Sequence, residues 1–423
     1  MSAPSPTKPI LEHDPRVEHW DAMREVSSGR FSDVRCRMIL KGCKWDPQVG
    51  DLATLAPFPL VLPAGVARTL GQLAERLTAE SLDAERTMLE RPECMRMLGM
   101  PRAVRRALAV PAKPTPAAAR VIRYDFHPTS EGWRISEANA DVPGGYTESS
   151  LFPRLMAEHC PGTRPAGDPA AALSDAIVAA MGSPGSVGLL AATGHMEDQQ
   201  VIAFLAGLLR ARGCSAVRAH PRQVIWDDGA ALLSGPAWGG RPLDALVRFY
   251  QGEWLGRRSG RHGFAEFFRG GRTPVCNPGT ALMIESKRFP LVWDRLGLDL
   301  PTWRTLLPPT CDPGRLNGRL GPGWVLKTAF CNTGDTVAIA AGPDRGRWNR
   351  AVWGARLHPG RWVAQRRFET LPIPTPRGPM YPCLGVYTVD GRAAGVFGRM
   401  ASRPLIDLAA VEVAVLRDGD ESG

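Results

Sequence analysis

The sequence predicts a mixed α/β fold with α+β character, and three patterns along the chain support this prediction. Residues 186–250 alternate strand, helix and strand, which is typical of a parallel sheet with helices packed on it. Residues 119–138 hold two short runs of β-branched and aromatic residues, which predict a β-hairpin. Residues 324–340 hold two further predicted strands around a polar loop. At 423 residues, the chain is long enough for roughly three structural units.

The N-terminal region, residues 1–115, is expected to be mainly helical, because apolar residues recur at helical spacing over 66–77. No residue pattern there indicates chemistry, so the region is interpreted as scaffold. Residues 111–116 read Pro-Ala-Lys-Pro-Thr-Pro, which predicts a linker.

The predicted hairpin has strands at 119–126 and 133–138 and a polar turn at 127–132. Side chains alternate across a strand, so Arg123 and Asp125 share one face, and Glu137 and Asn139 share one face. If the register aligns the two faces, a guanidinium faces a group of hard oxygen ligands, the kind that Mg²⁺ prefers. The alternative is an ordinary solvated hairpin face with mixed charges.

A glycine turn at 141–148 is predicted to lead into a helix, a geometry that brings backbone amides close to a ligand. The strand–helix–strand pattern over 186–250 indicates a Rossmann-like unit, with a helix that Gly213 ends. It has no G-x-G-x-x-G sequence, so it is not interpreted as a dinucleotide site. His195 lies at the predicted strand-to-helix turn, where it either lines a substrate pocket or begins a helix without chemistry.

Lysine is rare in this chain, with six residues, and arginine supplies most of the positive charge. Lys287 and Lys327 are the two lysines beyond residue 113, and a compact ammonium on a flexible stem suits a phosphate contact. Asn277-Pro-Gly-Thr precedes a predicted helix that carries Lys287. Lys327 ends a strand before the polar loop 331–336, and such a strand–loop–strand unit suits a lid over a triphosphate.

Composition limits the class of protein. No apolar run approaches the roughly 20 residues of a membrane span, and residues 1–20 do not resemble a signal peptide, so we expect a cytoplasmic protein without membrane contact. The nine cysteines have no paired spacing and are expected to be reduced thiols. The net charge of +10 leaves a nucleic-acid partner open, but the basic residues are dispersed, and we expect small-molecule partners instead.

In their order, these segments resemble the glutathionylspermidine synthase family, the circularly permuted branch of the ATP-grasp ligases. The motifs are Arg123-x-Asp125, Glu137-x-Asn139-Ala-Asp141, the Glu253-Trp254 turn, the two lysines, 365–372, and Gly395 to Arg399. The resemblance implies a circularly permuted ATP-grasp core with an inserted Rossmann-like pre-ATP-grasp unit. It divides the chain into a helical region at 1–115, a magnesium hairpin at 116–165, the Rossmann-like unit at 175–275 and the nucleotide-binding part at 276–423.

The resemblance also assigns roles to individual residues. Asp125, Glu137 and Asn139 would bind Mg²⁺, and Arg123 and Arg399 would be catalytic. The nucleotide ATP would be contacted by Lys287, Lys327, Gly334 and Gln365.

Two segments depart from the family pattern. The lid loop reads Asn332-Thr-Gly-Asp335 where the family usually has Arg-Glu-Gly, and the stretch after Arg399 lacks the usual acidic residues and asparagine. The amidase domain of bifunctional members is absent from this sequence, so any activity is expected to be synthetic only.

The implied function is that of an ATP-dependent carboxylate–amine ligase that forms an amide bond through an acyl phosphate. The partners would be a small-molecule or peptide carboxylate and an amine acceptor, and the sequence identifies neither. Two alternatives stay open: a catalytically degenerate ATP-binding protein with a regulatory role, which the altered lid loop favours, and a nucleic-acid binder. A nucleophilic mechanism through Cys331 or Cys383 has no histidine nearby in sequence to support it.

Overall fold

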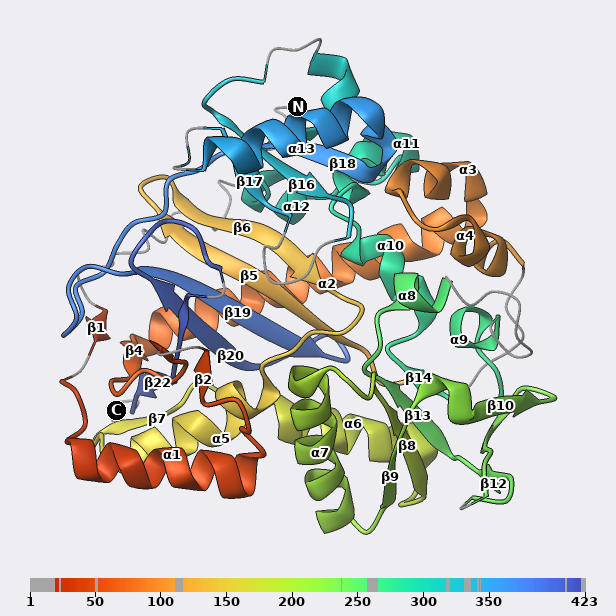
Figure 1. The fold of residues 1–423 in the computed structure, drawn as a ribbon, viewed down its shortest axis with the longest axis horizontal. Coiled ribbons are helices and arrows are strands. Elements are labelled where there is room, and N and C mark those ends of the chain that lie inside the picture. Colours follow the sequence, from red (N-terminus) through yellow and green to blue (C-terminus); the bar gives the residue numbers. More distant parts are fainter. Residues whose placement is uncertain are drawn as a thin grey trace, which may run out of the picture.

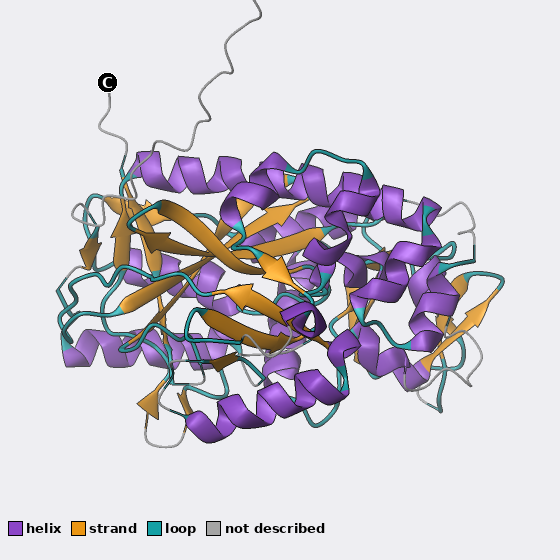
Figure 2. Cartoon of the chain, turned by 90° about the horizontal axis from the view of Figure 1, so that it is seen from above, coloured by secondary structure: helices purple, strands orange, loops and turns teal. Residues whose placement is uncertain are grey.

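The computed structural model describes residues 20–22, 24–49, 52–110, 117–236, 238–256, 265–316, 320–330, 336–340, 342, 344–407 and 409–419. The linker predicted at 111–116 and the lid residues 331–335, which include Gly334 and Cys331, lie outside these ranges. Seen from above, helices lie on the outer sides of the molecule and most strands lie between them (Figure 2).

The centre of the molecule is an antiparallel sheet in the order β21–β20–β19–β5–β6. Its strands are β5 (Val121–Thr129), β6 (Gly132–Asn139), β19 (Tyr381–Val389), β20 (Arg392–Ala401) and β21 (Val411–Val413). The long helix α2 (Ala64–Glu90) covers one face (Figure 1). On that face Tyr124 is fully buried, and its hydroxyl lies 3.2 Å from Thr78 Oγ1 and 3.1 Å from Ser81 Oγ of α2. The opposite face is therefore available for a site.

The predicted hairpin is confirmed as β5 and β6, but its turn is shorter than expected. The strands continue to Thr129 and Gly132, whereas the sequence predicted a turn over 127–132. Proline lacks an amide hydrogen and usually excludes a central strand position. Pro128 is tolerated because β19 pairs with β5 no further than Phe126, so no partner needs the missing donor on that side.

A second hairpin lies in the same sheet. Strands β19 and β20 are joined through Asp390 and Gly391, both with positive φ (46° and 81°). Such a two-residue turn matches the twist of the strands it joins, and glycine adopts positive φ without strain.

The Rossmann-like unit is a parallel sheet in the order β14–β13–β8–β9, as the sequence predicted. Its strands are β8 (Ser186–Leu190), β9 (Ser215–Ala219), β13 (Ala245–Arg248) and β14 (Val275–Cys276). The helix between β8 and β9 is α7 (Met196–Ala211), and α6 (Pro169–Met181) packs beside it. Gly213, with φ 82°, follows the end of α7.

A third sheet has the order β15–β18–β16–β17 and is covered by α13 (Arg345–Leu357), at the top of Figure 1. Its strands are β15 (Thr310–Cys311), β16 (Trp324–Thr328), β17 (Ala338–Ile339) and β18 (Trp362–Arg366). The predicted strands on both sides of the polar loop are thus β16 and β17, and they pair antiparallel.

The N-terminal region contains the predicted helices and also short strands. Strand β4 (Leu60–Leu62) pairs parallel with β22 (Val415–Asp418), so early and late parts of the chain share a sheet with β1 (Asp21–Ala22) and β7 (Thr163–Pro165). The remaining strands are β2 (Gln48–Val49), β3 (Leu52–Ala53), β10 (Val224–Asp227), β11 (Ala230–Leu233) and β12 (Arg241–Pro242). The remaining α-helices are α1 (Ser28–Gly42), α3 (Pro92–Met95), α4 (Arg102–Leu108), α5 (Tyr146–Ala157), α8 (Gly252–Gly256), α9 (Glu266–Arg269), α10 (Leu282–Glu285), α11 (Trp293–Leu296) and α12 (Pro301–Leu306).

Within the described residues, no helix combines the length and the apolar character needed to cross a membrane. The eight cysteines in these ranges are all free thiols.

Candidate active site

A cavity of about 490 Å³ lies on the face of the central sheet opposite α2. Alternation along β5 directs Tyr124 and Phe126 to the α2 side, and Arg123, Asp125 and His127 to the cavity. The predicted site residues that line the cavity are Arg123, Asp125, Glu137, Asn139, Lys327, Gln365 and Arg399. These residues come from five strands, three of the central sheet and two of the third sheet. Lys287 borders the cavity through its contact with Glu137.

A bulge between β5 and β6 sets which side chains of β6 reach the cavity. Arg123 is opposite Asn139, but the register shifts between Tyr124 and Phe126, so that Asp125 faces both Ser136 and Glu137. The extra residue turns two successive side chains toward the cavity. The sequence predicted Glu137 and Asn139 here and missed Ser136, because a bulge has no signature in the alternation.

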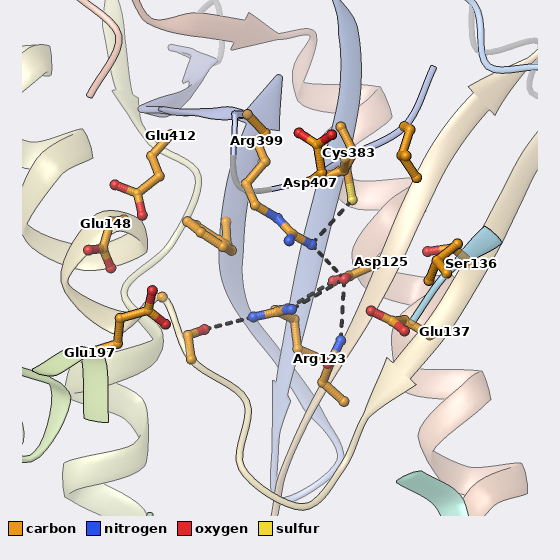
Figure 3. Close-up of a pocket in the computed structure, with 18 of the residues that line it drawn as sticks. Arg123, Asp125, Ser136, Glu137, Glu148, Glu197, Cys383, Arg399, Asp407 and Glu412 are labelled. Atoms are coloured by element: carbon orange, nitrogen blue, oxygen red, sulfur yellow. Dashed lines mark hydrogen bonds and ion pairs between the residues drawn. The ribbon is translucent and has the colours of Figure 1, made fainter. Parts of the chain in front are cut away.

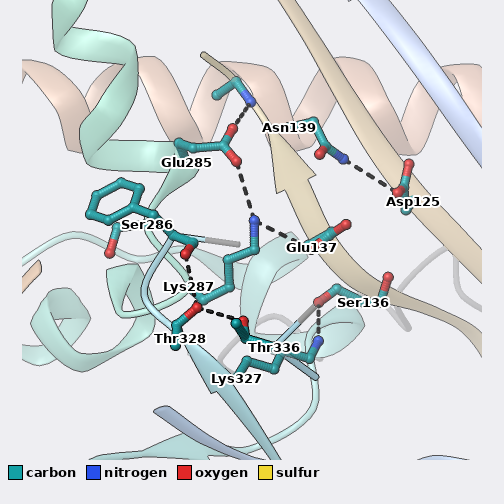
Figure 4. Close-up of polar contacts among 12 residues, drawn as sticks. Asp125, Ser136, Glu137, Asn139, Glu285, Ser286, Lys287, Lys327, Thr328 and Thr336 are labelled. Carbon is teal, nitrogen blue, oxygen red and sulfur yellow. Dashed lines mark hydrogen bonds and ion pairs between the residues drawn. The ribbon is translucent and has the colours of Figure 1, made fainter. Parts of the chain in front are cut away.

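Asp125 is the centre of the polar contacts at the site. It accepts hydrogen bonds from Arg123 Nε at 2.8 Å and Arg399 Nη2 at 2.7 Å (Figure 3). It also accepts one from Asn139 Nδ2 at 3.3 Å (Figure 4). Burial alone would raise the pKa of Asp125, but Arg123 and then Arg399 outweigh burial and hold it well below its usual range. The two guanidinium groups also lie on the ring of Phe397, each 5.4 Å from its centre.

The glycine turn after β6 contributes to the same site. Gly145 has φ 90° and precedes α5, as the sequence predicted. The carbonyl of Gly144 accepts a hydrogen bond from Arg123 Nη1 at 2.8 Å. This contact fixes the guanidinium from the side opposite its bond to Asp125.

Lys287 was expected on a helix, and this expectation was wrong. Helix α10 ends at Glu285, and Ser286 is extended (ψ 121°), because the backbone amide of Lys287 donates to Ala329 O instead of continuing the helix. Lys287 Nζ lies 3.3 Å from Glu137 and 3.2 Å from Glu285 (Figure 4). Glu137 has a lowered pKa, since Lys287 outweighs the effect of burial.

Lys327 and Gln365 lie on the paired strands β16 and β18 and are both buried. Lys327 Nζ donates to Gln365 Oε1 at 2.9 Å and to Ser136 O at 3.0 Å. Gln365 Nε2 donates to Thr310 Oγ1 at 3.2 Å. These contacts tie the third sheet to the central sheet at the cavity wall.

Several cavity residues were missed at the sequence level. His127 is buried, contacts Ser136 Oγ through Nε2 at 3.1 Å and packs on Phe368, and burial lowers its pKa to about 4. Continued alternation along β5 would have indicated it. The N-terminal region, interpreted as scaffold, supplies Lys44, Asp46 and Thr54 to the wall. His195 does line the cavity, 3.2 Å from Asp198.

Cys383, one candidate nucleophile, also lines the cavity. Burial, and then Asp125, raise the pKa of its thiol to about 12, so it stays protonated at neutral pH. A protonated buried thiol is a poor nucleophile. Its environment therefore gives no support to a mechanism through Cys383.

The oxygen ligands at the site suit Mg²⁺ that is bound together with a nucleotide. The described residues contain no group of three or more His, Cys, Asp or Glu side chains that could hold a metal ion. Mg²⁺ in nucleotide sites is usually bound through one or two carboxylates together with phosphate oxygens and waters. Asp125 and Glu137 both have lowered pKa values and so are ionised, and Asn139 adds an amide oxygen, so the set fits this mode.

Comparison with known proteins gives the fold and the family of the chain. No curated protein matches the sequence. The glutathione synthetase-like effector from Globodera pallida in its apo form has a TM-score of 0.60 at 12% identity, with 96% of this chain and 98% of that chain covered. This level of similarity shows a shared fold.

Two further structures match with lower TM-scores. A putative gamma-glutamylcysteine synthetase from Methylobacillus flagellatus KT has 13% identity over 78% of this chain and 84% of that chain, with a TM-score of 0.40. A RimK domain protein ATP-grasp from Sphaerobacter thermophilus DSM 20745 has 17% identity over 56% and 92%, with a TM-score of 0.30.

A match to the sequence pattern of a protein family shows the family of this chain. The pattern described as glutathionylspermidine synthase pre-ATP-grasp matches residues 61–413, well over half of the chain. The match includes the central sheet, the Rossmann-like unit and the third sheet. The chain therefore has an ATP-grasp fold and belongs to the glutathionylspermidine synthase pre-ATP-grasp family, whose members are of the carboxylate–amine ligase kind.

Proposed function

We propose that this protein is an ATP-dependent, Mg²⁺-requiring ligase that joins a carboxylate to an amine through an acyl phosphate. One observation supports the proposal: cationic side chains and oxygen ligands from distant segments of the chain line the same cavity. Arg123, Asp125 and Glu137 come from the hairpin, Lys327 from the third sheet and Arg399 from β20. A solvated hairpin face would not require a lysine from another sheet to close over it.

The first step would activate the carboxylate, because a carboxylate anion and an ammonium ion do not condense at neutral pH. A carboxylate oxygen attacks the γ-phosphorus of ATP, the bond to the β–γ bridging oxygen breaks, and ADP leaves with that oxygen. The protein contributes positioning and charge stabilisation to such a transfer. Arg123 and Arg399 would bind the transferring phosphoryl oxygens, and Lys327 and Lys287 would bind nucleotide phosphates. Gln365 and the neighbouring backbone would meet the adenine.

Asp125, Glu137 and Asn139 would hold Mg²⁺, which supplies charge neutralisation to the phosphates when bound. In the second step the neutral amine attacks the acyl carbon, the carbon–oxygen bond to phosphate breaks, and the amine loses a proton. The same arginines would stabilise the oxyanion of the tetrahedral intermediate. The products are the amide and inorganic phosphate.

The proposal is tested by calorimetry of nucleotide binding, with and without Mg²⁺, on the wild type and on a Glu137→Ala, Asn139→Ala variant. We expect Mg²⁺-dependent binding that the variant loses. Binding would justify a screen of carboxylate and amine pairs for ADP release. A folded wild type that binds no nucleotide would overturn the proposal.

A second candidate is an ATP-binding protein without ligase activity. Both oxygens of Asp125 accept bonds from guanidinium groups, so these arginines compete with a metal ion for the carboxylate. This candidate predicts nucleotide binding without ADP release for every carboxylate and amine pair, whereas release that depends on both substrates would exclude it.

A further inference from the structure

One end of the cavity is acidic, although the chain as a whole carries a net charge of +10. In Figure 3, Glu148, Glu197 and Glu412 lie on one side of Arg123 and Arg399, and Glu137 lies on the other. The carboxylates that line the acidic end are Asp46, Glu148, Glu197, Asp198 and Glu412. They come from elements far apart in the chain, so the fold gathers them at this end.

Lys44 occupies the middle of part of this acidic end. Its Nζ lies 2.8 Å from Glu148, 2.9 Å from Glu412 and 3.4 Å from Asp46, and the residue is 5% exposed. Burial would lower the pKa of Lys44, but Glu148 and Glu412 outweigh it and keep the ammonium charged. A buried ammonium among three carboxylates is the arrangement that a bound primary amine would have. Here a side chain of the protein itself fills the position.

A neighbouring position in the same cavity has acceptors that no lysine or arginine pairs with among the described residues. Strands β8 and β13 are adjacent and parallel, so the segments after them meet at the carboxyl edge of the sheet. The first brings Glu197 and Asp198 at the start of α7, and the second brings Gln251. Gln251 is 7% exposed and lines the cavity, and its Oε1 has no hydrogen-bond partner among the described residues.

A buried acceptor without a partner is costly unless a ligand or water satisfies it. Asp198 has the imidazole of His195 3.2 Å away, and Glu197 is exposed to the cavity. Together, an unmatched amide oxygen and two carboxylates suit a ligand that donates several hydrogen bonds and carries positive charge. An alkylammonium group has both properties.

We propose that Glu197, Asp198 and Gln251 bind the ammonium group of the acceptor amine, and that Lys44 fills an adjoining cation position between Glu148 and Glu412. The acceptor of this chain would therefore carry one ammonium group, because a second one would meet the charge of Lys44. This inference rests on the proposed ligase function and specifies its amine substrate as a monoamine.

The test compares butylamine with 1,4-diaminobutane, in calorimetric titrations and thermal shifts of the full chain in the presence of Mg²⁺ and a non-hydrolysable ATP analogue. Tetramethylammonium chloride at matched ionic strength corrects for salt. In the wild type, the second ammonium group should give no gain in affinity. In Lys44→Ala, the ratio of diamine to monoamine affinity should rise at least tenfold, since the second ammonium replaces the lysine. Lys41→Ala, an exposed lysine on α1, is the matched control and should keep the wild-type ratio.

An unchanged ratio in Lys44→Ala would overturn the assignment of the lysine to a cation position. If that variant does not fold, the Glu197→Gln, Asp198→Asn variant decides: butylamine affinity should fall at least tenfold, and unchanged affinity would overturn the inference. Nucleotide binding is measured on the same samples. Nucleotide binding without any amine effect would reject the inference and leave the ligase proposal standing. Amine binding without nucleotide binding would reject the ligase and leave a cation site.

Discussion

Arg399 donates a hydrogen bond from Nη2 to Asp125 Oδ2 across 2.7 Å, although 274 positions separate the two residues in the sequence. The two residues lie on β20 and β5, which are not neighbours, because β19 runs between them. The arginine side chain therefore extends over β19 to reach the carboxylate. Arg123, from β5 itself, completes a pair of guanidinium groups on one buried anion.

The first prediction concerns this buried anion. Asp125→Asn keeps the shape of the side chain but leaves two buried guanidinium groups without their counter-charge, and Asp125 is 1% exposed. We expect the free energy of unfolding to fall by about 3–5 kcal/mol, the usual cost of removing one partner of a buried ion pair. Urea denaturation at pH 7 measures it.

The matched control is Asp294→Asn, which removes an exposed carboxylate paired with Arg304 at 2.8 Å. Exposed ion pairs contribute little, so this variant should unfold at nearly the wild-type urea concentration. An equally small change in the free energy of unfolding of both variants would show that Arg123 and Arg399 do not need Asp125 as a counter-charge.

The second prediction concerns the pH dependence of the free energy of unfolding. Burial raises the pKa of Asp198 from 3.8 to about 6, against the effect of His195. The folded protein therefore binds this proton more tightly than the unfolded chain does, and the contribution to stability is lost as the pH rises from about 4 to about 6. Asp198→Asn cannot titrate and so does not lose this contribution. The free energy of unfolding of the variant, relative to that of the wild type, should therefore rise by about 2 kcal/mol between pH 4 and pH 7.

Unfolding free energies of both proteins at pH 4 and pH 7 give this difference. Glu90→Gln removes an exposed carboxylate at the end of α2 that does not act on the pKa of Asp198, so it should follow the wild-type pH dependence. A parallel pH dependence for wild type and Asp198→Asn would show that Asp198 keeps its ordinary affinity for protons.

Sequence patterns predicted the structure correctly where it depends on residues that are close together in the chain. Alternation on β5 predicted that Arg123 and Asp125 share a face, and the two positive-φ residues between β19 and β20 form the turn expected of Asp-Gly. The bulge opposite Asp125 depends on how two strands align, so Ser136 was missed. The pairing of Lys44 with Glu412, 368 positions apart, depends on the tertiary fold and has no local signal.

The third prediction concerns nucleotide affinity. Lys327 is 6% exposed and held at the cavity by Ser136 O and Gln365 Oε1. Lys327→Met removes the ammonium while keeping most of the volume, so a charge-assisted bond to a phosphate would be lost. We expect the Kd for ATP to rise roughly 10- to 100-fold, since such bonds contribute about 1.5–3 kcal/mol.

Calorimetry with Mg²⁺-ATP measures the effect, and near-UV circular dichroism checks that the fold is kept. Lys41→Met, at an exposed position of α1, should bind ATP as the wild type does. An unchanged Kd in Lys327→Met would remove this residue from the nucleotide contacts.

The fourth prediction concerns the space that β19 leaves for the ion pairs. Gly385 pairs with Asp125 across the sheet, and a Cβ atom there would lie 2.7 Å from Arg123 Cδ and 3.0 Å from Asp125 Oδ1. Arg123 is buried and bonded on both sides, to Asp125 and to Gly144 O, so it has little room to move. Gly385→Ala should therefore cost about 1–3 kcal/mol of stability, as overpacking does, and should weaken ATP binding as well.

Gly207→Ala is the matched control, because nothing lies within 4 Å of a Cβ at that position in α7 and alanine favours the helix. In urea denaturation, the free energy of unfolding should fall in Gly385→Ala and rise slightly in Gly207→Ala. In ATP titrations, only Gly385→Ala should bind ATP more weakly than the wild type. If Gly385→Ala keeps both the stability and the ATP affinity of the wild type, Arg123 is free to shift. The contact between Asp125 and Arg399 across β19 would then not depend on a glycine at position 385.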